Sequence, residues 1–397
     1  MKKYNKITPE GTTDLLFEEC CARRYVEKSL TNVFSSRGFH EVVTPGVEFY
    51  DVFNPERSGI AQDVMYKMTD RRGRLIVMRP DSTLPIARLA ATRLKNSPKP
   101  MRLYYTQQMY RNNPALTGRS DEVMQTGIEM LGAGGRRVDL EVIVTAIEAL
   151  SKCVPDFRIE LGHAGLFQAF AEQLSISDDL REDIRSSIES KNYAALNSIL
   201  DTLGDGLPVQ AMRRLPRLFG GEEVFVQAAP LCTDKKATDT LDYLHELYTS
   251  LSELGLGDKI MIDLGLVQRN DYYTNIVFSA YVEQCGDAVL IGGRYDNLLA
   301  QFDSPMPAIG FAINVDALAK VLLERGKISP EPAIDIFVHS EDGFEMKALH
   351  HASQLVEQGL TCENSVFENH EQAIAYAKKQ GIGRVDFVGD TIITTKI

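Results

Sequence analysis

The sequence lacks the features that mark several common classes of protein. No apolar run reaches the length of a membrane-spanning helix, and Met1–Lys6 lacks the apolar core of a signal peptide. The six cysteines include no C-x-x-C pair, and the seven histidines include no H-E-x-x-H pair. We therefore expect a cytoplasmic chain with no membrane partner, no disulfide framework and no metal site.

Signatures of phosphate binding and of nucleophilic catalysis are also missing. The sequence contains neither G-x-G-x-x-G nor G-x-x-x-x-G-K-[ST], and no order of serine, histidine and aspartate supports a triad. The formal net charge is −12, and no basic run is interleaved with aromatic residues. An acidic chain repels phosphate backbones on average, so nucleic acid is not expected as a partner. No motif requires a cofactor.

The features that are present indicate a globular protein of several domains. The 397 residues are 44% hydrophobic and 25% charged, which leaves room for two or three domains. Helix and strand patterns alternate at first, become mostly helical from His163 to Thr249, and then return to strands. A small α/β pattern follows the proline-rich "GKISPEPA".

We therefore predict an α+β fold with one interrupted core. The predicted parts are a first core segment at 1–162, a helical insertion at 163–250, a second core segment at 251–326 and a C-terminal α/β unit at 332–397. Within the second core segment, "AIGFAINVDALAKVL" predicts a strand that runs directly into a helix. Such a junction suits a phosphorylated ligand, but no cation appears there before Lys320.

Polar residues that could carry chemistry gather in two stretches, "RPDST" and "MQTGIEML". In an extended backbone, alternate residues point to the same face. This would align Arg79, Asp81 and Thr83 in the first stretch, and Gln125, Gly127 and Glu129 in the second. The stretches "MYRNN", "RNDYYTN" and "GGRYD" add Arg111, Tyr273, Arg294 and Tyr295.

Taken singly, each of these groups fits a solvated sheet edge or a salt bridge as well as a ligand site. Taken together, they suit a zwitterionic amino acid. The carboxylates of Asp81 and Glu129 could balance an ammonium, while Arg111 could pair with a carboxylate or a phosphate. The amide of Gln125 and the tyrosine hydroxyls could bind polar nitrogens of a side chain.

The order and spacing of several motifs resemble histidyl-tRNA synthetase, a class II synthetase. The similarity covers Thr8 to about Leu323 and, more weakly, the C-terminal unit. It rests on "GFHEVVTPGVE", "MYRNNPALTGRSDEVMQTGIEMLG", "DYYTNIVF", "GGRYDNLL" and "AIGFAINVDAL". The resemblance implies a mostly antiparallel sheet flanked by helices, with a helical insertion and an α/β anticodon-binding domain. It also implies a histidine-binding set of Asp81 (a glutamate in synthetases), Thr83, Arg111, Gln125, Glu129, Tyr273 and Tyr295.

The sequence departs from the synthetase pattern at positions that handle phosphate. Where the family has a Glu-Arg pair at the start of the motif 3 helix, this chain has Asp316 and Ala317. The acidic position of motif 2 is Asn113. The arginine of the "RG-x-DYY" signature aligns with Gln268, and Arg269 is one residue out of register. Losing such cations should abolish adenylation.

The retained pocket and the lost cations together resemble the synthetase paralogues that regulate ATP phosphoribosyltransferase. "RPDSTLPIARLA" and "LPRLFGG" also resemble that family. The implied partners are a short-form catalytic chain, histidine as feedback effector, and a second copy of this chain within a hetero-oligomer. The C-terminal unit is expected to lack a final strand and helix after "DFVGDTIITTKI".

Three alternatives stay open at this point. The chain could be an active histidyl-tRNA synthetase or a related amino-acid ligase. It could be a histidine-binding module with another partner. Finally, the polar residues could be relics that only support the fold.

Overall fold

The computed structural model describes residues 4–53, 59–114, 118–267, 273–328 and 334–397. The chain divides into two compact units, one of residues 1–15 and 22–325 and the other of residues 16–21 and 326–397. Among the described residues, no helix combines the length and apolarity needed to cross a membrane. The six cysteines carry free thiols.

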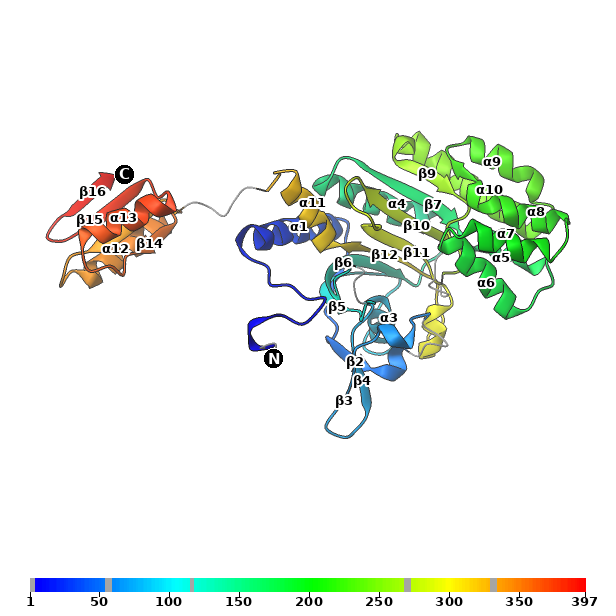
Figure 1. Ribbon diagram of the computed structural model, residues 1–397, viewed down its shortest axis with the longest axis horizontal. Coiled ribbons are helices and arrows are strands. Elements are labelled where there is room, and N and C mark those ends of the chain that lie inside the picture. Colours follow the sequence, from blue (N-terminus) through cyan, green and yellow to red (C-terminus); the bar gives the residue numbers. More distant parts are fainter. Residues whose placement is uncertain (1–3, 54–58, 115–117, 268–272, 329–333) are drawn as a thin grey trace. The chain divides into compact units, whose positions relative to one another are not determined.

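A nine-stranded sheet forms the centre of the first unit (Figure 1). In spatial order, its strands are β1 (His40–Glu41), β5 (Met101–Tyr110), β6 (Glu122–Leu131), β12 (Ala308–Asn314), β11 (Leu290–Arg294), β10 (Ile276–Val282), β7 (Phe157–His163), β9 (Ile260–Asp263) and β8 (Phe219–Gly220). All neighbours from β5 to β7 are antiparallel, as the sequence predicts. The β1–β5 and β7–β9 pairs are parallel.

Helices cover one face of this sheet. They are α1 (Phe17–Ser36), α4 (Arg136–Cys153) and α11 (Val315–Glu324). The buried ring of Phe34 on α1 contacts Tyr104 of β5 and Phe311 of β12, which lie on the same face. Figure 1 shows α1 and α11 side by side, and Arg23 of α1 forms an ion pair with Asp316 of α11.

A small sheet and a helix stand beside the strands that carry the polar motifs. The small sheet has the order β2 (Val47–Phe49), β4 (Leu75–Met78), β3 (Lys67–Thr69), and both pairs are antiparallel. The strands β3 and β4 form a hairpin. It leads into α3 (Thr83–Ala91).

The extended backbone that would align the residues of "RPDST" does not continue to the end of that stretch, because α3 begins at Thr83. The Asp81 carboxylate accepts a hydrogen bond from the backbone N–H of Leu84 at 3.1 Å. Pro85 lies in the first turn of the helix, where its missing N–H has no cost. Capping chemistry thus favours a helix start over a strand at this position.

The segment between β7 and β9 is mostly helical. It contains α5 (Ala164–Glu172), α6 (Asp178–Glu189), α7 (Tyr193–Asp201), α8 (Leu207–Arg214), α9 (Glu223–Ala228) and α10 (Lys235–Glu253), with the short strand β8 between α8 and α9. Side chains of Ser177, Asn192 and Asp234 cap α6, α7 and α10 by accepting backbone N–H bonds.

The second unit is a small α/β sheet of its own. Its elements are β13 (Ile336–Ser340), α12 (Glu345–Glu357), β14 (Cys362–Asn364), α13 (His370–Gln380), β15 (Arg384–Val388) and β16 (Ile392–Lys396), with strand order β14-β13-β15-β16. Within "DFVGDTIITTKI", β16 pairs antiparallel with β15 and forms an edge of the sheet. The Thr394 hydroxyl donates to the buried Asp386 at 2.8 Å, which helps to hold this edge.

Candidate functional site

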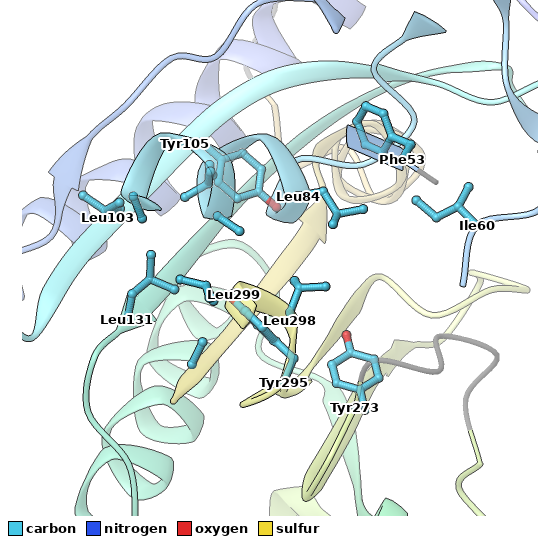
Figure 2. Packing of buried hydrophobic residues seen from close by; sticks show 14 of the residues in the cluster. Phe53, Ile60, Leu84, Leu103, Tyr105, Leu131, Tyr273, Tyr295, Leu298 and Leu299 are labelled. Carbon is cyan, nitrogen blue, oxygen red and sulfur yellow. The ribbon is translucent and has the colours of Figure 1, made fainter. Parts of the chain in front are cut away.

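The candidate site lies on the face of the large sheet opposite α1. Phe311 points toward α1, so its neighbours Gly310 and Ala312 face the other side. A hydrophobic cluster supports this second face, where Leu84 of α3 packs with Tyr105, Tyr273 and Tyr295 (Figure 2).

Glycines hollow the centre of this face. Glu129 of β6, Gly310 of β12 and Gly293 of β11 are cross-strand neighbours in one row. A Cβ atom on Gly310 would lie 2.0 Å from Oε2 of Glu129, and one on Gly293 would lie 2.6 Å from the Tyr273 ring. The sequence can therefore bury these two functional side chains only because both neighbours lack a Cβ.

The hollow continues into a cavity with a volume of about 470 Å³, which we call the sheet cavity. Its size is within the range of small-molecule sites in proteins. Six of the seven residues that the resemblance implied for histidine line it: Asp81, Thr83, Arg111, Gln125, Tyr273 and Tyr295. The seventh, Glu129, is only 2% exposed and reaches the cavity through hydrogen bonds to two of those residues.

Glu129 is a buried acid whose hydrogen bonds connect two sides of this group. The Thr83 hydroxyl donates to its Oε1 at 2.8 Å, and the Tyr295 hydroxyl donates to its Oε2. Burial raises the pKa of Glu129 to about 8, although both hydroxyls favour the ionised form and act in the opposite direction. The side chain therefore carries a proton at neutral pH until a cation approaches it.

A second carboxyl and a cation stand at the start of α3. Burial raises the pKa of Asp81, while the charge of Arg111 and the helix N–H groups act to lower it. The Arg111 guanidinium donates through Nε to the carbonyl oxygen of Pro80 at 2.9 Å. This bond holds the guanidinium at the cavity while its remaining N–H groups can meet an anion. Tyr105 donates to the Gln125 amide oxygen at 3.2 Å and fixes that amide.

Two arginines of the predicted clusters have structural roles instead. The guanidinium of Arg79 is buried and donates to the backbone carbonyl oxygens of Thr44, Pro45 and Gln108 at 2.7–2.8 Å. It thereby joins three segments of chain. Arg294 is buried in an ion pair with Asp139 of α4. This is the salt-bridge alternative that the sequence left open.

Sequence reasoning missed the acidic end of the sheet cavity. Glu160 of β7 and Asp263 of β9 line it, with Tyr281 of β10 and Lys191. Burial raises the pKa of Asp263 to about 6, and the nearby Glu160 adds to the shift. Burial also raises the pKa of Glu160, against the charge of Lys191. Alternation in "FRIEL" and "IMID" could have shown which face these acids take, but not that β7 and β9 are neighbours.

The start of α11, where the synthetase resemblance implies an arginine, contains no cation. Ala317 donates its backbone N–H to Oδ1 of Asn314 at 3.0 Å. Asp316 accepts from Arg23 and from the backbone N–H of Met124 at 2.7 Å. The Asn314 side chain thus satisfies one free N–H of the helix terminus, and Asp316 ties the helix to α1 and β6. Gln268 and Arg269, the other departure, lie outside the described residues.

Comparison with known proteins agrees with this architecture. The family model described as histidyl-tRNA synthetase matches residues 11–318. An ATP phosphoribosyltransferase regulatory subunit of Clostridium botulinum is 38% identical over 401 aligned residues, which span 100% of this chain and 95% of that protein.

Solved structures give the same result. One from Bacillus halodurans, described as an ATP phosphoribosyltransferase regulatory subunit/histidyl-tRNA synthetase, superposes with a TM-score of 0.86 and 27% identity, covering 95% of this chain and 97% of that one. A histidyl-tRNA synthetase from Nostoc has a TM-score of 0.79, 21% identity and coverage of 99% and 97% of the two chains. At that identity it shows the fold alone, and the predicted class II synthetase-like α+β fold is confirmed.

Proposed function

Because the chain belongs to the family of ATP phosphoribosyltransferase regulatory subunits, we propose that it binds histidine in the sheet cavity and transmits this signal to a catalytic ATP phosphoribosyltransferase chain. Its role is regulatory and belongs to histidine biosynthesis. The observation that carries the proposal is the convergence of six implied residues on one cavity above a buried glutamate.

The chemistry of the cavity matches each polar group of histidine. Asp81 and Glu129 would receive the α-ammonium, and its charge would favour ionisation of Glu129. Tyr273 would meet a ring nitrogen, and Gln125 is a further polar contact. Arg111 would pair with the ligand carboxylate. With one principal carboxylate contact worth about 1.5–3 kcal/mol, affinity should be modest, which suits a feedback sensor.

The same cavity is poorly suited to adenylation. Phosphate transfer from ATP needs preorganised positive charge where negative charge develops. The described cavity residues include the cations Arg111, Arg119 and Lys191, but these stand among the acids Asp81, Glu160 and Asp263. Arg119 is paired with Asp287 at 2.9 Å, and Ala317 replaces the arginine that the synthetase pattern has at the start of α11. We therefore propose that this chain is not a ligase. Histidine-dependent pyrophosphate exchange by the pure protein would contradict this.

Self-association is a further part of the proposal. Strand β2, which begins at the end of "GFHEVVTPGVE", presents Val47 and Phe49 to solvent, and β3 presents Met68 on the same small sheet. Exposed apolar faces of this kind suit a protein interface. We propose that a second copy of the chain covers this face, within a hetero-oligomer that also contains the short-form catalytic subunit.

Titration calorimetry with histidine tests the binding proposal directly. We expect one saturable site per chain, and Arg111→Gln should weaken it about tenfold or more through loss of the carboxylate contact. Arg37→Gln, a substitution of an arginine paired with Glu148 away from the cavity, is the matched control. Absence of saturable binding at millimolar histidine would overturn the proposal.

A further inference from the structure

A second cavity, which we call the helix cavity, lies between the helical segment and the large sheet. It has a volume of about 450 Å³ and is lined by α5, α6 and β10 together with Val267 and Tyr273. Val267 and Tyr273 also line the sheet cavity, so they form a shared wall between the two spaces. None of the residues implied by the synthetase resemblance, other than Tyr273, belongs to it.

Most charges around the helix cavity are neutralised by neighbours. Glu172 is paired with Lys236 at 2.6 Å. Arg185 forms ion pairs with Glu182 and, at 3.0 Å, with Glu189. These pairs involve three lining residues, Glu172, Glu182 and Arg185, and two neighbours, Lys236 and Glu189, so each of these charges has a partner of opposite sign.

Arg181 is different. Its Nε is buried and has no hydrogen-bond partner among the residues that the structure describes. Its ion pair is with Asp178 at 3.4 Å, and the Asp178 side chain is 95% exposed. A buried N–H without a partner is costly, and a solvated aspartate compensates the guanidinium weakly. The Arg181 side chain as a whole is 40% exposed, so the cavity offers a cation that reaches its open space and whose Nε lacks a partner among the described residues.

The remaining walls are apolar or aromatic. Phe167 and Tyr273 are both buried, and Ala164, Val267 and Val277 fill the space between them. A ligand must therefore combine an anionic group for Arg181 with an apolar or planar body. We propose that the helix cavity is a second ligand site, which binds a small organic carboxylate or phosphate through Arg181.

The shared wall would couple this ligand to the sheet cavity. The Tyr273 ring lies against Gly293, where even a Cβ atom would be 2.6 Å away, so it cannot retreat toward the sheet. A ligand that pushes the ring from one cavity must alter the other, and the coupling must be reciprocal. This coupling rests on the proposed histidine site, whereas binding in the helix cavity does not.

Calorimetry with two probes tests the site and separates the two anion sources. Adenosine 5′-monophosphate is the phosphate probe, and 3-phenylpropionate is the carboxylate probe. We expect saturable binding of at least one, with the identity of the binder showing which anion is preferred. Arg181→Gln should weaken that binding tenfold or more. Arg213→Gln, in the same helical segment but outside the cavity, should leave it unchanged.

Three results would overturn the site: neither probe binds, Arg181→Gln binds as the wild type does, or Arg213→Gln weakens binding equally. The coupling is tested by repeating the titration with histidine present. A changed probe affinity supports the shared wall. An unchanged affinity, with histidine shown to bind on its own, contradicts the coupling but not the site. If histidine does not bind at all, the proposed function fails while the probe result still stands.

Discussion

At the scale of single residues, the burial of one carboxyl group controls the electrostatics of the sheet cavity. The buried Glu129 carboxyl group contacts two hydroxyl donors in place of water, and it lies in a space left open by glycine. Two hydroxyl groups solvate an anion less well than water, which is why its pKa rises to about 8. A ligand ammonium would supply the missing compensation. Binding of a positively charged ligand would therefore favour loss of the proton from Glu129.

The first prediction concerns stability and pH. Because the pKa of Glu129 is raised in the folded state to about 8 from 4.5, its contribution to stability is fully present below about pH 4.5 and is lost as pH rises through 8. Wild-type protein should lose about 3 kcal/mol between pH 5.5 and 8.5 from this group. Glu129→Gln, which imitates the protonated form, should not show this loss of stability.

Denaturation monitored by circular dichroism at the two pH values measures this difference. Glu122→Gln, on the same strand but outside the cavity, is the matched control and should follow the wild type. An equal loss of stability in wild type and Glu129→Gln would show that Glu129 does not carry the proton.

The second prediction concerns affinity. Tyr295→Phe removes a hydrogen bond that favours ionised Glu129, so the pKa of Glu129 should rise further. Ionisation at pH 7.5 then becomes harder, and histidine affinity should fall about fivefold, as expected for one hydrogen bond. Tyr281→Phe is the control, because that tyrosine lines the same cavity beside Glu160 instead. Equal affinities for the two variants would contradict the role given to Glu129.

At the scale of elements, the local residue pattern predicts which face of a strand a side chain takes, but not which distant strands pair. The alternation in β5 and β6 is visible in the sequence, and it correctly puts Gln125 and Glu129 on one face. The parallel contact between β7 and β9 joins residues about 100 positions apart, and no local signal announces it. Glu160 and Asp263 were missed for that reason. Asp81 was placed in the site on the condition of an extended backbone, whereas its carboxylate accepts a hydrogen bond at the start of α3.

The third prediction concerns the start of α11. Asp316 joins this helix to α1 through Arg23 and to β6 through the N–H of Met124. Asp316→Ala removes both bonds and leaves a partly buried N–H without its acceptor, which should cost about 2–3 kcal/mol. Denaturant unfolding measures the loss. Asp287→Ala, whose ion pair with Arg119 is well exposed, should change stability by less than about 1 kcal/mol. Comparable losses in both would contradict a structural role for Asp316.

At the scale of the whole molecule, the sequence predicted the α+β core and the C-terminal α/β unit, while the exact boundaries at 162, 250 and 326 remain proposals. Composition bears on the partners instead, because a net charge of −12 disfavours phosphate-rich molecules. The sequence could not reveal the acidic end of the sheet cavity or the helix cavity, since both depend on tertiary packing.

The fourth prediction follows from this charge. We expect no specific binding of histidine tRNA at physiological salt, because an acidic chain gains little from counterion release. Filter binding with histidine tRNA and an unrelated tRNA measures both affinity and discrimination. Submicromolar binding that distinguishes the two tRNAs would contradict the prediction.

The central claim is that histidine acts through the sheet cavity, and one inhibition curve tests it. Complexes of the catalytic subunit with wild type, Glu129→Gln or the control Glu122→Gln are titrated with histidine. Activity is expressed relative to the uninhibited rate of each complex. We predict that Glu129→Gln raises the half-inhibitory histidine concentration at least tenfold, since it removes the charge that holds the ammonium, while Glu122→Gln behaves as wild type. An unchanged curve for Glu129→Gln would mean that histidine acts at another site.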